Sequence, residues 1–227
     1  MSKNLFITGT GTDIGKTYIT GLILKKFIEN QKSAAYYKAA MSGNERDAQG
    51  NLIPGDALQV KTVSGTRQPL EEMCPYVYEA AVSPHLAAQI EGNPVEIKEV
   101  LHRFDAVCSR YEYVTVEGSG GIVCPLRFDE QNIQLQDFIR ARNLNCLLVA
   151  DAGLGTINSV VLTVEYMRAH QINVKGIVLN HYQKGSKLCE DNLFMCESMT
   201  GLQVLACVSE GDCDLDISFE RLQALYE

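Results

Sequence analysis

The most informative segment of the chain reads Ile7-Thr8-Gly9-Thr10-Gly11-Thr12-Asp13-Ile14-Gly15-Lys16-Thr17. An apolar run enters it over Leu5–Ile7, and a run with helical apolar periodicity leaves it over Tyr18–Ile28. A strand, a glycine-rich turn and a helix form the context in which a Gly-Lys-Thr ending indicates a phosphate-binding loop. The glycines let backbone N–H groups turn inward around an anion, and the helix N-terminus adds its positive end. The segment therefore predicts a nucleotide site.

Two side chains of this loop carry predicted roles. Lys16 would reach the terminal phosphates, and the Thr17 hydroxyl would ligate the magnesium ion that they carry. One detail departs from the common G-x-x-x-x-G-K-S/T spacing, because its first glycine should fall at Thr10 and stands instead at Gly9. The loop is thus one residue longer than the standard pattern. A chance glycine-rich turn is the alternative, and the flanking strand and helix disfavour it.

Length and charge limit the classes of protein that fit. The 227 residues suffice for one large α/β domain, which we expect to span residues 1–227. Hydrophobic residues make up 46% and charged residues 21%, as in ordinary soluble enzymes. The net charge of -8 argues against nucleic acid or an anionic membrane as a partner.

Apolar patterning and cysteine spacing predict a cytoplasmic protein. No apolar stretch is long enough to span a bilayer, and an apolar strand pattern follows Met1-Ser2-Lys3-Asn4 without a visible signal peptide. The sequence contains no Cys-x-x-Cys and no histidine pair with ligand spacing, so we expect reduced thiols rather than a metal centre or disulfides. The eight cysteines stand at positions 74, 108, 124, 146, 189, 196, 207 and 213.

Short apolar runs alternate with amphipathic runs along the chain. This alternation predicts a three-layer α/β/α fold of the phosphate-binding-loop (P-loop) type, with a mainly parallel sheet and helices on both faces. The expected strands are Leu5–Thr8, Ala34–Tyr37, Tyr113–Glu117, Cys146–Ala150, Val174–Leu179 and Val204–Cys207. The expected helices are Lys16–Glu29, Ala57–Val63, Pro84–Ile90, Glu96–Arg110, Leu135–Ala141, Ile157–His170, Leu188–Met199 and Phe219–Tyr226.

Polar groups follow four of these strands. Lys38 follows the second, Glu117-Gly118-Ser119-Gly120-Gly121 ends the third, Asp151-Ala152-Gly153 follows the fourth and Asn180 follows the fifth. Right-handed crossovers bring the carboxyl ends of parallel strands to one edge of the sheet, where ligands bind. The sequence therefore predicts a functional site at this edge.

Two carboxylates and one lysine are the best candidates beside the loop. Magnesium usually takes one or two carboxylates together with phosphate oxygens, so Asp56 and Glu117 are predicted to join Thr17 as its ligands. Asp56 also precedes a helix, and an N-cap is the alternative for it. Lys38 at a strand end would hold an anionic substrate against the terminal phosphate, with an exposed edge lysine as the alternative.

Two further polar residues and one loop have open interpretations. Ser42 would position a substrate amine or carboxylate. Asn180 would hydrogen-bond a purine edge, and its alternative is a helix or turn cap. The glycine- and asparagine-rich loop over Met41–Gly55 is predicted to be exposed, as a lid over the site or as a plain connection.

Taken together, these stretches resemble the dethiobiotin synthetase family, from residue 3 to about residue 180. The ordered combination is much more specific than the phosphate loop alone. The matching stretches are Gly9-Thr10 through Gly15-Lys16-Thr17, Tyr37-Lys38, Ser42-Gly43, Asp56-Ala57-Leu58, Ser83-Pro84-His85, Val116-Glu117-Gly118, Gly120-Gly121, Gly155 with Ile157-Asn158, and Asn180.

The resemblance implies an ATP- and magnesium-dependent closure of a ureido ring on 7,8-diaminononanoate with carbon dioxide. A carbamate forms on one amine, attacks the γ-phosphate, and the second amine then displaces phosphate from the mixed anhydride. The residues that it implies for the nucleotide are Thr12, Asp13, Ile14, Gly15, Lys16, Thr17, Tyr18, Asp56, Glu117, Gly118, Ser119, Gly120 and Asn180. Those implied for the substrate are Lys38, Ser42, Gly121, Thr156 and Asn158, with Lys16 and Lys38 catalytic and Thr17, Asp56 and Glu117 on the metal.

The same resemblance implies a homodimer. The distant carboxylate of the substrate would lie at a helix start across the dimer interface, at Gly155-Thr156-Ile157-Asn158. Two segments depart from the family pattern. Gly11 stands where an acidic residue is common, and Val204–Ser209 replaces a Gly-x-Ile-Pro motif near the base, which leaves the base selectivity open.

Two other functions share this fold. A cobyrinate-type ATP-dependent amide ligase would normally carry a further glutamine-using domain, for which 227 residues leave little room. A switch ATPase of the partition or septum-site type would place a signature lysine five residues before Lys16, where this chain has Gly11. Both alternatives remain weaker than the resemblance to the dethiobiotin synthetase family.

Overall fold

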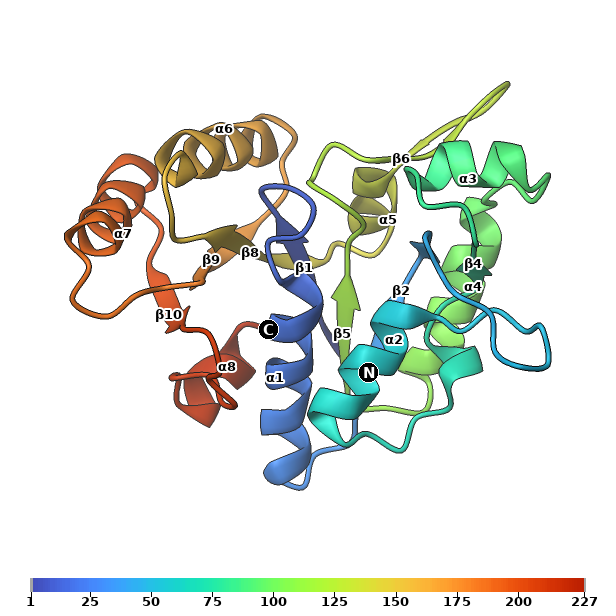
Figure 1. Ribbon diagram of the computed structural model, residues 1–227, viewed down its shortest axis with the longest axis horizontal. Coiled ribbons are helices and arrows are strands. Elements are labelled where there is room, and N and C mark those ends of the chain that lie inside the picture. The colour runs from blue at the N-terminus through green and yellow to red at the C-terminus, as the bar shows by residue number, and fades with distance from the viewer. Residues whose placement is uncertain (1, 227) are drawn as a thin grey trace.

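The computed structural model describes residues 2–226, so Met1 and Glu227 of the predicted domain lie outside the described residues. Its centre is a six-stranded parallel sheet in the order β10-β9-β8-β1-β5-β2, with helices on both faces (Figure 1). The strands are β1 (Lys3–Gly9), β2 (Ala34–Lys38), β5 (Tyr113–Glu117), β8 (Asn145–Asp151), β9 (Val174–Asn180) and β10 (Val204–Val208). The predicted fold class is confirmed.

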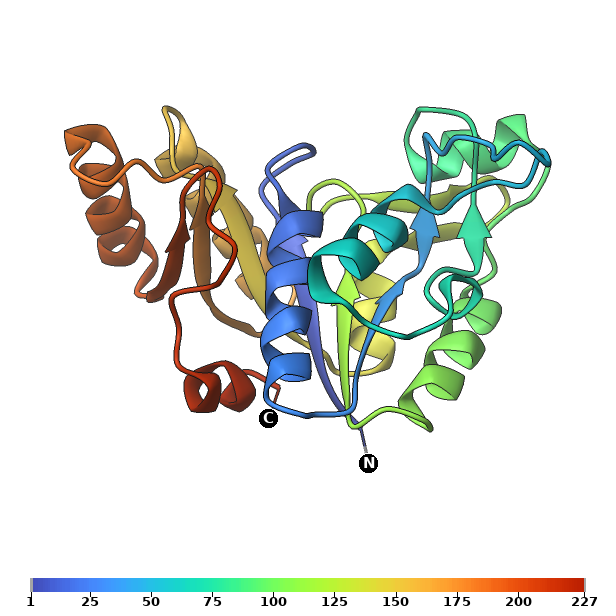
Figure 2. The same ribbon diagram turned by 60° about the horizontal axis from the view of Figure 1, so that its bottom comes forward.

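Strand order and register bring the polar strand ends together. β1 lies between β8 and β5, and β2 is the edge strand beyond β5. Ile7 and Lys38 are both register partners of Glu117. Because these strands are parallel, their carboxyl ends meet at one edge of the sheet, close to the turn that leads into α1 (Lys16–Glu29) (Figure 2).

Alternate residues of each strand face opposite layers. Tyr36 of β2 packs in the core under α1, α2 (Gly55–Ser64) and α8 (Phe219–Ala224). Tyr37 packs in the core on the other face, under α4 (Ile97–Cys108) and α5 (Leu135–Ala141). A third core cluster lies under α6 (Thr156–Ala169) and α7 (Lys187–Thr200) on that second face. Side-chain alternation in β2 therefore decides which residues can reach the α1 side.

The C-terminal segment closes the core beside α1. The ring centroid of Phe27 lies 4.6 Å from that of Tyr113, 5.2 Å from Phe219 and 4.8 Å from Tyr226. Burial of one such aromatic side chain contributes about 1.5–3 kcal/mol to folding. The last helix thus belongs to the same core as the phosphate loop's helix.

Several short elements are absent from the sequence prediction. β3 (Ala40–Met41) pairs with β4 (Tyr76–Val77), and β6 (Pro125–Phe128) forms a hairpin with β7 (Asn132–Gln134). The 3₁₀ helix η1 (Leu70–Glu72) is likewise absent from the prediction, whereas helix α3 (Pro84–Ile90) has the predicted bounds. The loop after β3 is held at its base, because Asn44 donates to the Tyr78 carbonyl at 2.8 Å and accepts from the Gly55 N–H at 2.9 Å.

Two negative findings concern the described part of the chain. Between residues 2 and 226, no helix combines the length and apolar character needed to cross a membrane. All eight cysteines lie within this range, and each is a free thiol.

Candidate active site

Two glycines shape the phosphate loop. Gly15 is the N-cap of α1 and has a φ of 88°, a left-handed conformation that suits glycine. A Cβ atom on Gly9 would lie 2.5 Å from the Ile14 side chain and 2.9 Å from Cδ of Lys16. The alkyl chain of Lys16 therefore runs directly over Gly9, and only a residue without a side chain allows this path.

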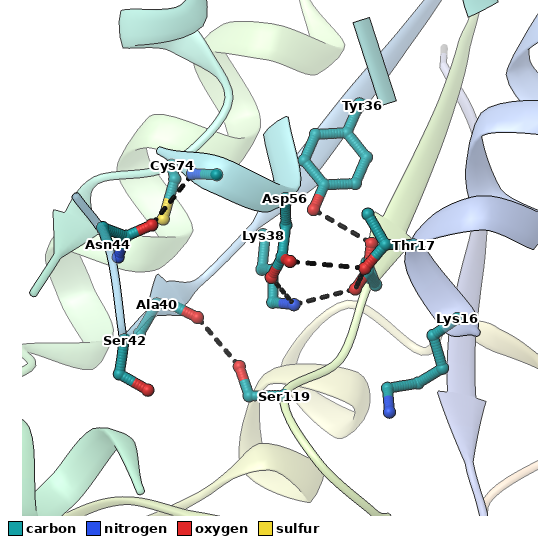
Figure 3. Close-up of polar contacts among 12 residues, drawn as sticks. Lys16, Thr17, Tyr36, Lys38, Ala40, Ser42, Asn44, Asp56, Cys74 and Ser119 are labelled. Carbon is teal, nitrogen blue, oxygen red and sulfur yellow. Dashed lines mark hydrogen bonds and ion pairs between the residues drawn. The ribbon is translucent and has the colours of Figure 1, made fainter. Parts of the chain in front are cut away.

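Lys16 is buried, with 6% of its surface exposed, and its ammonium donates to the Gly11 carbonyl at 2.6 Å. Burial and the nearby Lys38 ammonium together lower the pKa of Lys16 to about 8, against the opposing effect of the Glu117, Asp56 and Asp13 carboxylates. A cation with so little solvation stabilises an incoming anion strongly. Figure 3 shows the Lys16 side chain extending below the Thr17 and Lys38 cluster, into the open part of the site.

Four side chains from four elements form one polar cluster beside the loop (Figure 3). The Lys38 ammonium donates to Asp56 Oδ2 at 2.6 Å and to Glu117 Oε1 at 2.8 Å. The Thr17 hydroxyl donates to the same Oε1 at 2.9 Å and approaches Asp56 Oδ1 at 3.4 Å. The structure thus brings the strand-end residues Lys38 and Glu117 together with Thr17 of the loop motif and Asp56 of α2.

The charges in this cluster depend on one another. Glu117 is 1% exposed and Lys38 is 5% exposed. Burial alone would lower the pKa of Lys38, but Glu117 and Asp56 outweigh it and raise this pKa above its ordinary value. Removing one partner from a buried ion pair leaves an uncompensated charge, which destabilises a protein by about 3–5 kcal/mol. Lys38 therefore stays an ammonium and Glu117 keeps a cation beside it.

Tyr36 completes the cluster, and Gln68 binds the backbone of Tyr36. Sequence reasoning missed both residues. The fully buried Tyr36 hydroxyl donates to Glu117 Oε2 at 3.0 Å. Burial and the Glu117 charge raise the pKa of Tyr36 well above its ordinary value, so the hydroxyl keeps its proton. Strand periodicity carried a signal for Tyr36, because it precedes Lys38 by two residues and so shares its face of the sheet.

A cavity of about 880 Å³ opens beside the cluster. Most of the predicted site residues line it: Thr12, Asp13, Gly15, Lys16, Thr17, Tyr18, Lys38, Ser42, Asp56, Glu117, Ser119, Gly120 and Gly121. Residues that the prediction did not assign also line it, from β3 and the turns before α3 and β6: Ala40, Met41, Ala81, Val82, Val123 and Cys124. This volume lies in the upper part of the range of ligand-binding sites in proteins.

Other predicted residues lie outside the lining of this cavity. Asn180 donates through Nδ2 to the Ile14 carbonyl at 3.0 Å, which braces the phosphate loop. Gly118 lies under the loop, where a Cβ atom would meet Phe6 and Leu135 at 3.0 Å. Thr156 and Asn158 lie at the start of α6, and within one chain neither lines the main cavity.

Two details describe how Asp56 and Ser42 are held. Asp56 lies in the first turn of α2 behind the N-cap Pro54, so its carboxylate serves the cluster and not a cap. The Ser42 hydroxyl donates to the Val82 carbonyl at 2.6 Å while it lines the cavity. Ser119 likewise donates to the Ala40 carbonyl at 2.8 Å, which ties the glycine-rich turn after β5 to β3.

The donor set of the cluster suits magnesium. Asp56, Glu117 and Thr17 offer two carboxylates and a hydroxyl, and magnesium completes its shell with phosphate oxygens and water. Within residues 2–226 no group of three or more histidine, cysteine, aspartate and glutamate side chains could hold a metal ion alone. The set therefore fits a metal that arrives with a phosphate, not one caged by protein.

Solved structures with this fold include a cell division complex and a ParA family ATPase. The MinC:MinD cell division complex of Aquifex aeolicus matches with a TM-score of 0.53 and 13% identity, covering 99% of this chain and 93% of that chain. A ParA family ATPase from Chlorobium tepidum matches with the same TM-score and identity, covering 93% of this chain and 85% of that one. At this identity the likeness concerns the fold alone.

Sequence comparison is more specific. The family described as AAA domain matches residues 3–212. The ATP-dependent dethiobiotin synthetase BioD of Brachyspira hyodysenteriae is 44% identical over 228 residues, covering 100% of both chains. The enzyme of the same name from Clostridium perfringens is 42% identical, covering 92% of this chain and 91% of that one. On this full-length similarity, the chain belongs to the dethiobiotin synthetase family of ATP-dependent, carbon–nitrogen bond-forming ligases.

Proposed function

We propose that the protein carboxylates 7,8-diaminononanoate with carbon dioxide and closes the ureido ring of dethiobiotin at the expense of magnesium-ATP. One amine and carbon dioxide form a carbamate. A carbamate oxygen attacks the γ-phosphorus and ADP leaves. The second amine attacks the carbonyl carbon of the mixed anhydride, the C–O bond breaks, and phosphate departs with the former carbamate oxygen. The family assignment supports this reaction.

One observation carries the proposal. Two buried lysines from different elements, Lys16 at the start of α1 and Lys38 at the end of β2, line a single cavity, and the Asp56 and Glu117 carboxylates that pair with Lys38 line it too. The reaction needs two anions, a triphosphate and a carbamate, to meet without repelling each other. Cations held in place before the reaction stabilise the charge that develops in the transition state. Lys16 would serve the phosphates and Lys38 the carbamate.

The residues that would hold magnesium are Thr17, Asp56 and Glu117. When bound, the ion would neutralise charge on the ATP phosphates. The nucleotide's phosphates would lie along residues 12–18 and against the turn at 118–120, with Asn180 bracing the loop. The lining of the cavity by residues 12, 13, 15–18, 119 and 120 and the left-handed Gly15 before α1 support these roles.

The carbamate is already a nucleophile, so this reaction needs no strong base from the protein. The thiol that lines the cavity agrees with this, because burial raises the pKa of Cys124 to about 11 and keeps it protonated. Ser42 and Gly121 would hold the diamine against the carbamate site, since both line the same cavity as Lys16 and Lys38.

The far carboxylate of the substrate requires a second copy of the chain in this proposal. The first turn of α6 carries N–H groups without intrahelical partners, and Gly155 before it has a φ of 91°. Beside it lies an apolar hollow of about 420 Å³ lined by Leu154, Leu162 and Met199, and Leu154 is 93% exposed. An exposed apolar surface of this kind suits a homodimer.

We further propose that the enzyme acts in the cytoplasm.

The experiment supplies 7,8-diaminononanoate, magnesium-ATP and bicarbonate labelled with oxygen-18. We expect mass spectrometry to detect dethiobiotin, and the released phosphate to carry one labelled oxygen, because the carbamate oxygen leaves with phosphorus. Hydrolysis of ATP that is independent of the diamine, with no ureido product, would instead support a switch ATPase.

A further inference from the structure

We propose that Tyr36 is a positioning residue for the metal-binding carboxylate of Glu117. Its hydroxyl holds Glu117 Oε2, so that Oε1 faces Thr17 and the phosphate loop. The inference rests on the proposed function, in which Glu117 is a magnesium ligand. It concerns a residue that the motif comparison did not single out.

The two oxygens of Glu117 have different partners. Oε1 accepts from Thr17 at 2.9 Å and from Lys38 at 2.8 Å, on the side of the cavity. Oε2 accepts at 3.0 Å from the hydroxyl of Tyr36, which is fully buried in the core. A carboxylate turns about its terminal bond easily. The Tyr36 hydrogen bond removes that freedom and fixes which oxygen is offered to a cation.

Tyr36 is itself held rigidly. Its N–H donates to Gln68 Oε1 at 2.8 Å, and its carbonyl accepts from Gln68 Nε2 at 2.9 Å. Tyr36 is 0% and Gln68 1% exposed, so neither exchanges these partners with solvent. The Gln68 side-chain amide thus pairs with the backbone N–H and carbonyl of Tyr36, as the backbone of a neighbouring strand would. A side chain anchored at its backbone and packed under α1 and α2 gives its hydroxyl a single position.

The adjacent residue provides a matched control. Tyr37 is equally buried on the same strand, and its hydroxyl donates to the Val100 carbonyl at 2.7 Å. It lies on the opposite face of the sheet, in the core under α4 and α5. Tyr36→Phe and Tyr37→Phe therefore remove the same group and a comparable hydrogen bond, and only the first touches Glu117.

The experiment measures the ATP affinity of each variant by calorimetry, once in EDTA and once in excess magnesium. The ratio of the two affinities reports the contribution of the metal. We expect Tyr36→Phe to lower this ratio about 10-fold, as loss of an outer partner of a metal ligand does. Its affinity in EDTA stays at the wild-type value. Tyr37→Phe lowers stability comparably and leaves the ratio unchanged.

Turnover gives a second readout. The free magnesium concentration at half-maximal turnover should rise in Tyr36→Phe by more than kcat falls. Combined with Glu117→Gln, Tyr36→Phe should change the affinity ratio no further, because the oriented carboxylate is already gone.

Three results would overturn the inference. The first is an equal ratio of ATP affinities in Tyr36→Phe and wild type, where the wild type makes dethiobiotin and binds ATP more tightly with magnesium. This result would refute the role of Tyr36 but not the proposed function. An additive loss in the double variant would also refute the role of Tyr36. A wild-type protein without any magnesium effect or ureido product would refute the proposed function, and the inference with it.

Discussion

Two acid–base pairs stand at the carboxyl edge of the sheet, and they differ in burial. Lys38 and Glu117, on β2 and β5, have side chains that are 7% and 1% exposed. Asp151 and His181, at the ends of β8 and β9, have side chains that are 46% and 52% exposed at 2.6 Å. Equivalent positions in the fold therefore hold one pair shielded from water and one open to it.

Burial decides what each pair can do. In water a salt bridge contributes about 0–1 kcal/mol, because solvent screens both charges. In the low-dielectric cluster each charge acts strongly on its neighbours, and Lys38 is held by two carboxylates at once. Position at a strand end therefore indicates a candidate site. Burial of the charged side chains then distinguishes a reactive cluster from a surface ion pair.

The largest expected effect follows from removing the buried cation. Lys38→Ala should lower turnover about 100-fold or more, as loss of a charge-stabilising donor does, with ATP affinity nearly unchanged. Steady-state kinetics and calorimetry on protein with a wild-type circular dichroism spectrum provide the comparison. Near-normal turnover would show that the buried pair is only structural and would erase the difference between the two pairs.

A smaller effect concerns pH and the second buried lysine. Lys16 has a pKa near 8, so in the ligand-free protein it is an ammonium below that pH and neutral above it. Only the ammonium attracts phosphate, so ATP affinity in EDTA should fall about 10-fold from about pH 7 to about pH 9. Isothermal titration at each pH measures this. Lys16→Ala should bind weakly and without this dependence, and a flat wild-type profile would contradict the assignment.

The smallest effect is expected at the exposed pair. Asp151→Asn keeps the oxygen that accepts from the Gly153 N–H at 2.7 Å and replaces the charged Oδ2 beside His181 Nδ1 with a neutral NH₂ group. The free energy of unfolding in urea should change by less than about 1 kcal/mol, with turnover at the wild-type level. A loss comparable with that of Lys38→Ala would mean that exposure does not separate the two pairs.

Much of the fold could be predicted because its signals are local. The bounds of α1, α3 and α5 agree with the predicted helices, since Gly15 and Pro84 mark two of the starts. β3 and β4 are only two residues long and pair across 36 positions, from Ala40 to Tyr76, so no periodicity could indicate them. Short strands of this kind are specified by tertiary contacts.

The residues of the site also fall into a group that local signals predict and a group that depends on tertiary contacts. A loop motif and strand ends located Lys16, Thr17, Lys38 and Glu117, because topology brings such positions to one edge. Gln68 lies in no motif, and its contact with Tyr36 arises only once the chain after α2 passes the edge strand. Roles that depend on an irregular segment meeting a strand have no signature in local spacing.

The way the outer edge of β2 is covered has a consequence for assembly. Edge strands invite pairing with a strand from another molecule, because their outward amides and carbonyls lack partners. Here the outward groups of Tyr36 are taken by Gln68, and the Lys38 N–H donates to the Met73 carbonyl at 2.8 Å. A strand of a neighbouring chain therefore has no free backbone groups to pair with at these positions. The segment that carries Gln68 and Met73 holds Tyr36 in place and also protects this edge of the sheet from aggregation.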